Sequence, residues 1–220
     1  MIKVTIDPSL QSLLPKLNLG IVFAKVQVSK HNDDLWKEID HCVSLIYKYD
    51  MESLYHIEGI EALREGYKTI GKDPSRYRGS AEALARRIIL GKGLYKVNTI
   101  VDINNLVSLE SMNSVGSYDL SNIGQSVLFR IGKNGESYKG IGKEMINIAE
   151  LPVFADENGP FGSPTSDSER AMILESTKNL MMIVISFTGK ESLNKYLERI
   201  SSLLVRYANA DIKQVETVIV

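Results

Sequence analysis

The sequence has few of the residues that form covalent cross-links and metal sites. It contains one cysteine, which excludes an internal disulfide, and Cys42 lies on an apolar helical stripe that predicts a core position rather than a catalytic thiolate. Its three histidines share no ligand spacing with one another or with a pair of carboxylates. We therefore expect no metal and no other cofactor.

Long apolar runs are also missing. No stretch approaches the roughly 18 apolar residues that a membrane-spanning helix needs. At the N-terminus, Lys3 and Asp7 interrupt a short apolar pattern, so a secretory apolar region is not recognisable there. We expect a cytoplasmic protein without a membrane partner.

Two common enzyme signatures are absent as well. Gly66, Gly71 and Lys72 have the spacing of a phosphate-binding loop, but Asp73 stands where a magnesium-binding Ser or Thr belongs, and a predicted helix precedes the loop instead of a strand. No Gly-x-Ser-x-Gly sequence occurs, so an α/β-hydrolase triad has no nucleophile elbow. These two enzyme classes are excluded.

The composition that remains is that of a folded chain. It has 220 residues, of which 44% are hydrophobic and 24% charged, enough for a sizeable core in one large domain. Helical patterns fill the first half, and short β segments separated by Asn134-Gly135 and Asn158-Gly159 turns follow Gly116. This segregation predicts an α+β fold.

Individual elements follow from periodicity and end signals. Asn32 or Asp33 should open a helix to about residue 48, and Gly71 should end one over 57–70. The apolar run 179–187 should be a central strand covered on both faces, and Thr188 with Glu191 should cap a following helix. Further strands are predicted over 19–28, 97–103, 125–131, 138–141, 151–156 and 215–220, with a helix after 105.

Residues 64–105 form the most distinctive stretch. Ser80 should cap a helix that ends before Gly91, with one apolar stripe buried and with Glu82, Arg86 and Arg87 facing outward. From Arg64 to Lys96 there are nine basic and three acidic residues, net +6 in a chain of net −1. Such asymmetry predicts contact with a polyanion or a carboxylate ligand, and a solvated basic face without a partner is the competing interpretation.

Three motifs carry a resemblance to a known family. They are YRGSAEALARR at 77–87 with Lys92-Gly93 after it, VDINN at 101–105 and PTSDSER at 164–170. The sequence resembles the tRNA-binding B3/B4 domain, the editing domain of the phenylalanyl-tRNA synthetase beta chain, and in particular stand-alone proteins built from that domain. The likeness is strongest over 50–190, and we treat 1–220 as a single such domain.

The resemblance implies a β-sandwich-like mixed core flanked by helices, and a cleft that in the synthetase hydrolyses the ester of tRNA wrongly charged with tyrosine. By position, Asn105 keeps an asparagine of that pocket and Asp119 keeps an aspartate. A histidine of the family pattern is replaced by Gly116, and a glutamate falls near Ile183. The chain is far shorter than a synthetase subunit, so we expect no aminoacyl-tRNA ligase activity by itself.

A polar loop before the 179–187 strand offers substitutes for the missing groups. It carries Thr165, Ser166, Asp167, Glu169 and Arg170, and functional side chains concentrate on loops of this kind. A solvated surface turn capped by Asp167 is the competing interpretation. We expect a cleft between this loop and Asn104-Asn105, which would follow the predicted 97–103 strand.

Two functions are therefore carried forward. The first is binding of tRNA or aminoacyl-tRNA, with hydrolysis of mischarged esters in trans. The second is a non-enzymatic binding module for a free amino acid or related metabolite. The residues assigned to the first are Asn105, Asp167 and Glu169 for catalysis, Asn104, Thr165, Ser166, Arg170 and Arg78 for substrate, and Arg76, Arg78, Arg86, Arg87 and Lys92 for RNA.

Overall fold

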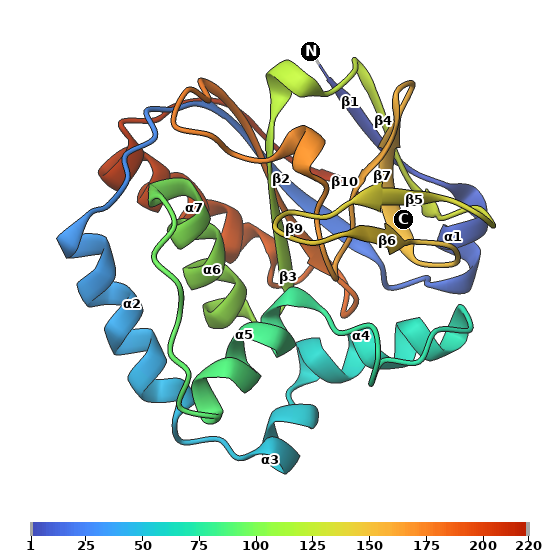
Figure 1. Cartoon of the computed structure of the whole chain (residues 1–220), viewed down its shortest axis with the longest axis horizontal. Coiled ribbons are helices and arrows are strands. Elements are labelled where there is room, and N and C mark those ends of the chain that lie inside the picture. The colour runs from blue at the N-terminus through green and yellow to red at the C-terminus, as the bar shows by residue number, and fades with distance from the viewer. Residues whose placement is uncertain (1, 219–220) are drawn as a thin grey trace.

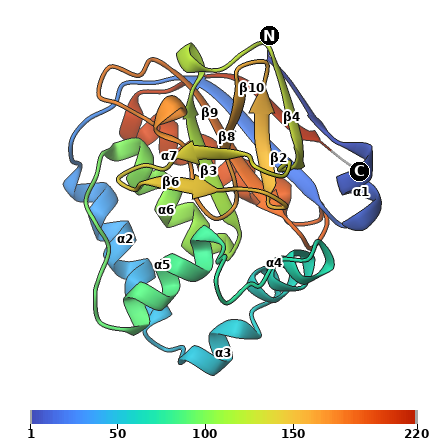
Figure 2. The same ribbon diagram turned by 45° about the vertical axis from the view of Figure 1, so that its right-hand side comes forward.

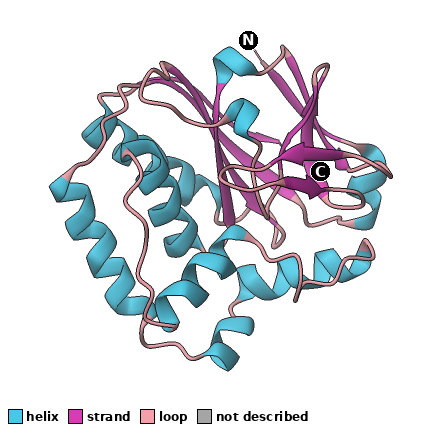
Figure 3. Cartoon of the chain, in the orientation of Figure 1, coloured by secondary structure: helices cyan, strands magenta, loops and turns pink. Residues whose placement is uncertain are grey.

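A computed structural model describes residues 2–218 and shows three layers (Figures 1 and 3). The middle layer is a sheet in the order β10-β2-β9-β3. Helices cover one face of it, and a second sheet, β1-β4-β7-β8, packs against the other (Figure 2). The predicted α+β fold with a sandwich-like core and flanking helices is confirmed.

Each of the two sheets includes strands that lie far apart in the sequence. The middle sheet consists of β2 Asn18–Lys25, β3 Ser114–Asp119, β9 Asn179–Ser186 and β10 Asp211–Val218, all antiparallel. The second sheet consists of β1 Lys3–Ile6, β4 Ser126–Ile131, β7 Pro152–Asp156 and β8 Gly159–Gly162. A separate hairpin is formed by β5 Ser137–Lys139 and β6 Met145–Asn147.

The helices lie mainly in the first half of the chain. They are α1 Pro8–Leu13, α2 Asp33–Ile46, α3 Met51–Tyr55, α4 Glu58–Thr69, α5 Ser80–Ile89, α6 Thr99–Ser111 and α7 Leu193–Ala208, with short 3-10 turns at Leu120–Asn122 and Glu169–Ala171. Among residues 2–218, no helix has the length and apolar content to cross a membrane.

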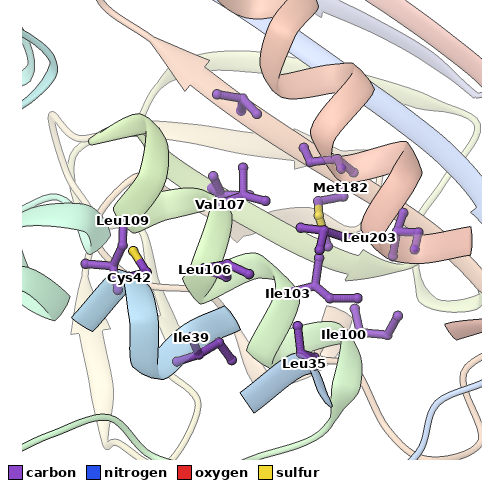
Figure 4. Close-up of a cluster of buried hydrophobic side chains, with 14 of the residues drawn as sticks. Leu35, Ile39, Cys42, Ile100, Ile103, Leu106, Val107, Leu109, Met182 and Leu203 are labelled. Carbon is purple, nitrogen blue, oxygen red and sulfur yellow. The ribbon is translucent and has the colours of Figure 1, made fainter. Parts of the chain in front are cut away.

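Strand β9 is the centre of both cores, as its apolar run predicts. Successive side chains of a strand point to opposite faces. Met182 and Val184 join the core under α2, α6 and α7, whereas Met181 and Ile183 join the core between the sheets. Figure 4 shows the first core, in which Met182 lies beside Ile103 of α6 and Leu203 of α7. The prediction of a doubly covered central strand is confirmed.

Several local signals are also confirmed. Asn32 caps α2, its side chain accepting a hydrogen bond from the Leu35 amide at 3.0 Å. Helix α4 ends just before Gly71, and α5 ends before Gly91. Cys42 is buried, and its burial raises the pKa of the thiol to about 11, so this side chain is a core residue.

The strand predicted over 97–103 is wrong, because α6 begins at Thr99. Asn98 caps the helix and accepts hydrogen bonds from the amides of Ile100 and Val101. Trp36 of α2 donates from Nε1 to the buried Asp102 at 2.8 Å, which ties α6 to α2. The β-branched run follows strand propensity, but the cap and the buried contacts on the helical side outweigh that weak preference.

Three smaller expectations are also wrong. The N-cap of α5 is Gly79 instead of Ser80, and Ser192 precedes α7 without a capping box from Thr188 and Glu191. Glu82 does not face outward: it is 2% exposed, because Arg64 donates to its carboxylate at 3.1 Å. The closing strand runs from Asp211 to Val218, and residues 219–220 of the predicted strand lie outside the described residues.

Candidate functional site

Tyr118 of β3 lies at the centre of the polar groups that face the space between the sheets. Its ring packs edge-on against Phe154 and Phe161, with centroids 5.8 and 5.1 Å away. Its hydroxyl donates to Asp167 Oδ1 at 2.8 Å, and the side chain is fully buried. Sequence patterns did not single out Tyr118, because a tyrosine in a short strand resembles any other core aromatic residue.

Two glycines make room for the Tyr118 ring. A Cβ atom added at Gly116 would lie 2.4 Å from the Tyr118 hydroxyl, and one added at Gly162 would lie 2.3 Å from it. Gly116 is the register partner of Ile183 on β9. These two neighbours are the positions at which the resemblance leads one to expect a histidine and a glutamate. The phenol of Tyr118 fills the space beside Gly116 that a larger side chain there would need.

Asp167 is the most strongly perturbed carboxyl group of this cluster. Burial raises its pKa to about 7, even though hydrogen bonds from Tyr118 and from the Ser163 amide favour the charged form. A carboxyl group with this pKa can accept or release a proton near neutral pH. Of the predicted catalytic residues, Asp167 is the one with the electrostatic properties of an acid–base group.

The predicted substrate residues Thr165 and Ser166 form hydrogen bonds within the protein that hold this loop in place. Thr165 Oγ1 shares a hydrogen bond with the buried Tyr67 hydroxyl at 2.8 Å. Ser166 offers its carbonyl to Tyr138 and to Ser163 Oγ. The loop is therefore held by hydrogen bonds on both sides, and its polar groups are largely satisfied within the protein.

Arg170 is also engaged within the protein. Its guanidinium makes two hydrogen bonds of 2.9 Å to the Asp156 carboxylate, whose side chain is 0% exposed, and two more to the carbonyls of Asn122 and Gly159. These four bonds leave little capacity for a ligand carboxylate. Its neighbours on the loop, Asp167 and Glu169, are not its partners: Asp167 accepts from Tyr118, and Glu169 pairs with Lys139 at 3.0 Å.

Asn104 and Asn105 lie on α6, which covers the opposite face of the middle sheet. Asn104 accepts a hydrogen bond from Ser117 Oγ at 2.7 Å. Ser117 and Tyr118 are consecutive strand residues, so their side chains point to opposite faces. The cleft predicted between Asn104-Asn105 and the 165–170 loop is therefore wrong, because the sheet separates the two groups.

The basic residues assigned to RNA follow helix α5 from end to end. Arg76 and Lys92 are exposed, whereas Arg78 lies 3.5 Å from the Glu82 carboxylate. Arg86 bonds the Tyr55 hydroxyl, and Arg87 stacks on the Tyr95 ring at 3.8 Å from its centroid. A ten-residue helix is about 15 Å long, so these residues span a substantial surface. Whether RNA contacts them stays a prediction.

A large open cavity of about 740 Å³ lies on the helical side instead of beside Asp167. It is lined by residues of α2, the end of α6 and Arg199 of α7, among them Cys42, Leu45, Leu109 and Glu110. Arg199 is held there by Glu38 and Glu110. Within residues 2–218, no cluster of three or more His, Cys, Asp or Glu side chains is arranged to hold a metal.

The family model described as the B3/4 domain matches residues 62–209. No curated protein matches the chain significantly. Among solved structures, an N-terminal fragment of the phenylalanyl-tRNA synthetase beta-subunit from Pyrococcus horikoshii matches 96% of this chain with a TM-score of 0.49 and 14% sequence identity. The match covers 50% of that fragment.

Proposed function

Because the chain belongs to the B3/4 domain family, we propose that it binds tRNA or aminoacyl-tRNA through the basic surface along α5. The observation that carries the proposal is the charge of residues 64–96, where nine basic residues stand against three acidic ones. Two of these acids are engaged locally: Glu82 is buried between Arg64 and Arg78, and Glu65 pairs with Lys68. Lys72 also pairs, with Glu150, whereas Arg76, Arg86, Arg87, Lys92 and Lys96 make no ion pair within residues 2–218, so the unpaired charge along α5 is positive.

Phosphate contacts make RNA binding depend on salt. Each contact contributes about −0.7 to −0.9 to the slope of log affinity against log salt concentration. We expect Arg76→Gln or Arg87→Ala to weaken tRNA binding and to make this slope shallower by about one contact. Arg76 is the cleaner test, because its exposed side chain has no packing role.

Lys3→Gln is the matched control, since Lys3 is an exposed cation on β1 of the other sheet. It should leave both the affinity and the slope unchanged. Filter binding or fluorescence anisotropy with unfractionated tRNA between 50 and 200 mM salt measures both quantities. Absence of tRNA binding at low salt would contradict the proposal. So would equal losses of tRNA affinity in Lys3→Gln and Arg76→Gln.

A second candidate function is hydrolysis of mischarged aminoacyl esters in trans, and Asp167 is the observation that favours it. Its raised pKa suits a general base that takes a proton from water while the water oxygen attacks the ester carbonyl. The ester C–O bond then breaks, and the proton held by Asp167 passes to the leaving ribose oxygen, which releases the amino acid and the ribose hydroxyl. Such a reaction would depend on Asp167 and not on a group at position 116, which is glycine.

Deacylation of a panel of mischarged tRNAs tests this second function. Asp167→Asn should lower the rate by about 100-fold or more, which is the usual contribution of a general base. Asn105→Ala is the control, because Asn105 lies on α6, on the other side of the sheet. No hydrolysis of any member by the parent protein would leave tRNA binding as the function and remove hydrolysis.

A further inference from the structure

The segment between α5 and α6, residues 90–98, is an exposed loop with an unusual surface. Leu90, Tyr95 and Val97 have relative exposures of 56%, 64% and 50%. The loop runs from the end of α5 alongside α2 to the start of α6 (Figures 1 and 2). Three large exposed apolar or aromatic side chains on one short loop indicate a binding surface.

The backbone of this loop leaves the surface open. Gly91 and Gly93 adopt left-handed conformations with φ of 70° and 60°. A Cβ atom at either position would meet no other atom within 4 Å. The two glycines therefore serve the turn, and the space beside them is free for a ligand.

Tyr95 is held in place although it is exposed. The Arg87 guanidinium covers one face of its ring, 3.8 Å from the centroid, and donates to the Lys92 carbonyl at 3.1 Å. Arg87 thereby joins the helix, the loop and the ring. With 64% of its surface still accessible, Tyr95 presents the other face of its ring in a fixed orientation. A fixed aromatic face loses little conformational entropy when a ligand stacks on it.

The charge around Tyr95 has one sign along the chain. Residues 83–101 contain Arg86, Arg87, Lys92 and Lys96 and no Asp or Glu. Lys96 lies over the Trp36 ring, 4.7 Å from its centroid, so it is anchored beside α2. Cations that alternate with an available aromatic face are the combination that binds single-stranded RNA, because phosphates meet the cations and a base stacks on the ring.

We infer that Tyr95, backed by Arg87, is a stacking platform for an unpaired base of RNA, and that Lys92 and Lys96 hold the adjoining phosphates. The inference rests on the proposed RNA binding and specifies which part of the RNA this end of α5 contacts. Bases within an A-form helix have their faces covered by neighbouring bases, so only a loop or a single-stranded end can reach the ring.

The test compares a single-stranded RNA of about ten nucleotides with the same sequence in a duplex, using fluorescence anisotropy. Tyr95→Ala should weaken single-strand binding by about 5- to 150-fold, the effect of losing one stacked base. Its salt slope should be unchanged, because no phosphate contact is lost. Tyr95→Phe should bind like the parent, since the ring remains.

A matched control is Met145→Ala, because Met145 is a 62% exposed apolar residue on β6, outside the segment. It should not alter affinity. In Tyr95→Trp, the added indole should be quenched on binding, beyond the response of the 8% exposed Trp36 in the parent. That signature reports stacking directly and would not arise from a structural role.

The possible results separate the two proposals. If the parent binds RNA and Tyr95→Ala binds it equally well, the stacking platform is overturned while RNA binding stands. The same holds if Tyr95→Ala loses as much affinity for the duplex as for the single strand. If the parent binds no RNA, both are overturned. Binding of the loop to anionic phospholipid vesicles, abolished by Tyr95→Ala in the absence of RNA binding, would assign the surface to a membrane instead.

Discussion

The 163–170 loop and the 76–96 segment meet at the N-terminus of α5, where the Ser80 amide donates to the Pro164 carbonyl at 2.8 Å. Both are rich in polar side chains, and sequence analysis assigned functional residues to both. The loop turns its polar groups inward, so that Asp167, Thr165 and Arg170 are bound by Tyr118, Tyr67 and Asp156. The basic segment leaves Arg76 and Lys92 exposed.

The contrast shows that polar composition alone does not distinguish a binding surface from a loop whose polar groups form hydrogen bonds within the protein. A buried polar group must be hydrogen-bonded, because leaving it unsatisfied costs about 1–3 kcal/mol. Changes in the loop should therefore reduce stability, and changes in the basic segment should reduce RNA binding with little effect on stability.

The largest expected effect is that of Tyr118→Ala. The fully buried ring fills the space beside Gly116 and Gly162, so its loss leaves a cavity and deprives Asp167 of one of its two donors. We expect the free energy of unfolding, measured by urea titration, to fall by about 3–5 kcal/mol. Tyr95→Ala, an equally large truncation at an exposed site, should change stability by no more than about 0.5 kcal/mol. Equal losses of stability in Tyr118→Ala and Tyr95→Ala would contradict this difference between the two regions.

Arg170→Ala should have the next largest effect. It leaves the Asp156 carboxylate buried without its cation, and breaking such a pair costs about 3 kcal/mol. Lys139→Ala is the matched control, because Lys139 of β5 forms an ion pair with Glu169 of the same loop, and the side-chain exposures are 62% and 35%. An exposed pair contributes about 0–1 kcal/mol. The comparison fails if both variants unfold at the same urea concentration.

The pH dependence of stability should distinguish Asp167 from Asp156. Burial raises the pKa of Asp167 from its usual 3.8 to about 7, so between these values the folded state holds a proton that the unfolded state has lost. Its contribution is present at low pH and is lost as the pH rises through about 7. For Asp156, burial opposes the shift, but hydrogen bonds from Arg170 and the Gly124 amide lower the pKa, and its contribution is lost as the pH falls.

Asp167→Asn removes the first of these contributions while keeping an acceptor for Tyr118. The difference in unfolding free energy between parent and variant should therefore decline from about pH 4 to about pH 8 and be flat above that. Urea titrations at intervals of one pH unit measure it. A difference that is constant with pH would show that the Asp167 carboxyl has its ordinary pKa.

The smallest effect on stability should come from Lys92→Gln. Lys92 is exposed beyond the end of α5, and surface substitutions of this kind stay within about 0.5 kcal/mol. The same variant should weaken RNA binding and reduce the salt slope by about one contact. A loss of stability comparable with that of Arg170→Ala would show that side chains of the basic segment also stabilise the fold.

Local sequence signals predicted much of this fold. Asn32 opens α2, Gly71 follows α4, and the apolar run of β9 forms the doubly covered strand. Each depends on groups within a few residues of one another or on a continuous burial pattern. The candidate site was predicted less well, since Asn105 and Arg170 were placed in one cleft although α6 and the 165–170 loop lie on opposite faces of the sheet.

By itself the sequence determined the α+β fold class, the B3/4 family and the concentration of positive charge along α5, because burial period, motif and charge are properties of neighbouring residues. Only the tertiary structure decided that Tyr118 of β3 occupies the space beside Gly162 of β8 and that Arg170 pairs with Asp156. These contacts join different strands and loops. Which polar group meets which partner depends on sheet order and register, and these are set by the packing of the whole chain.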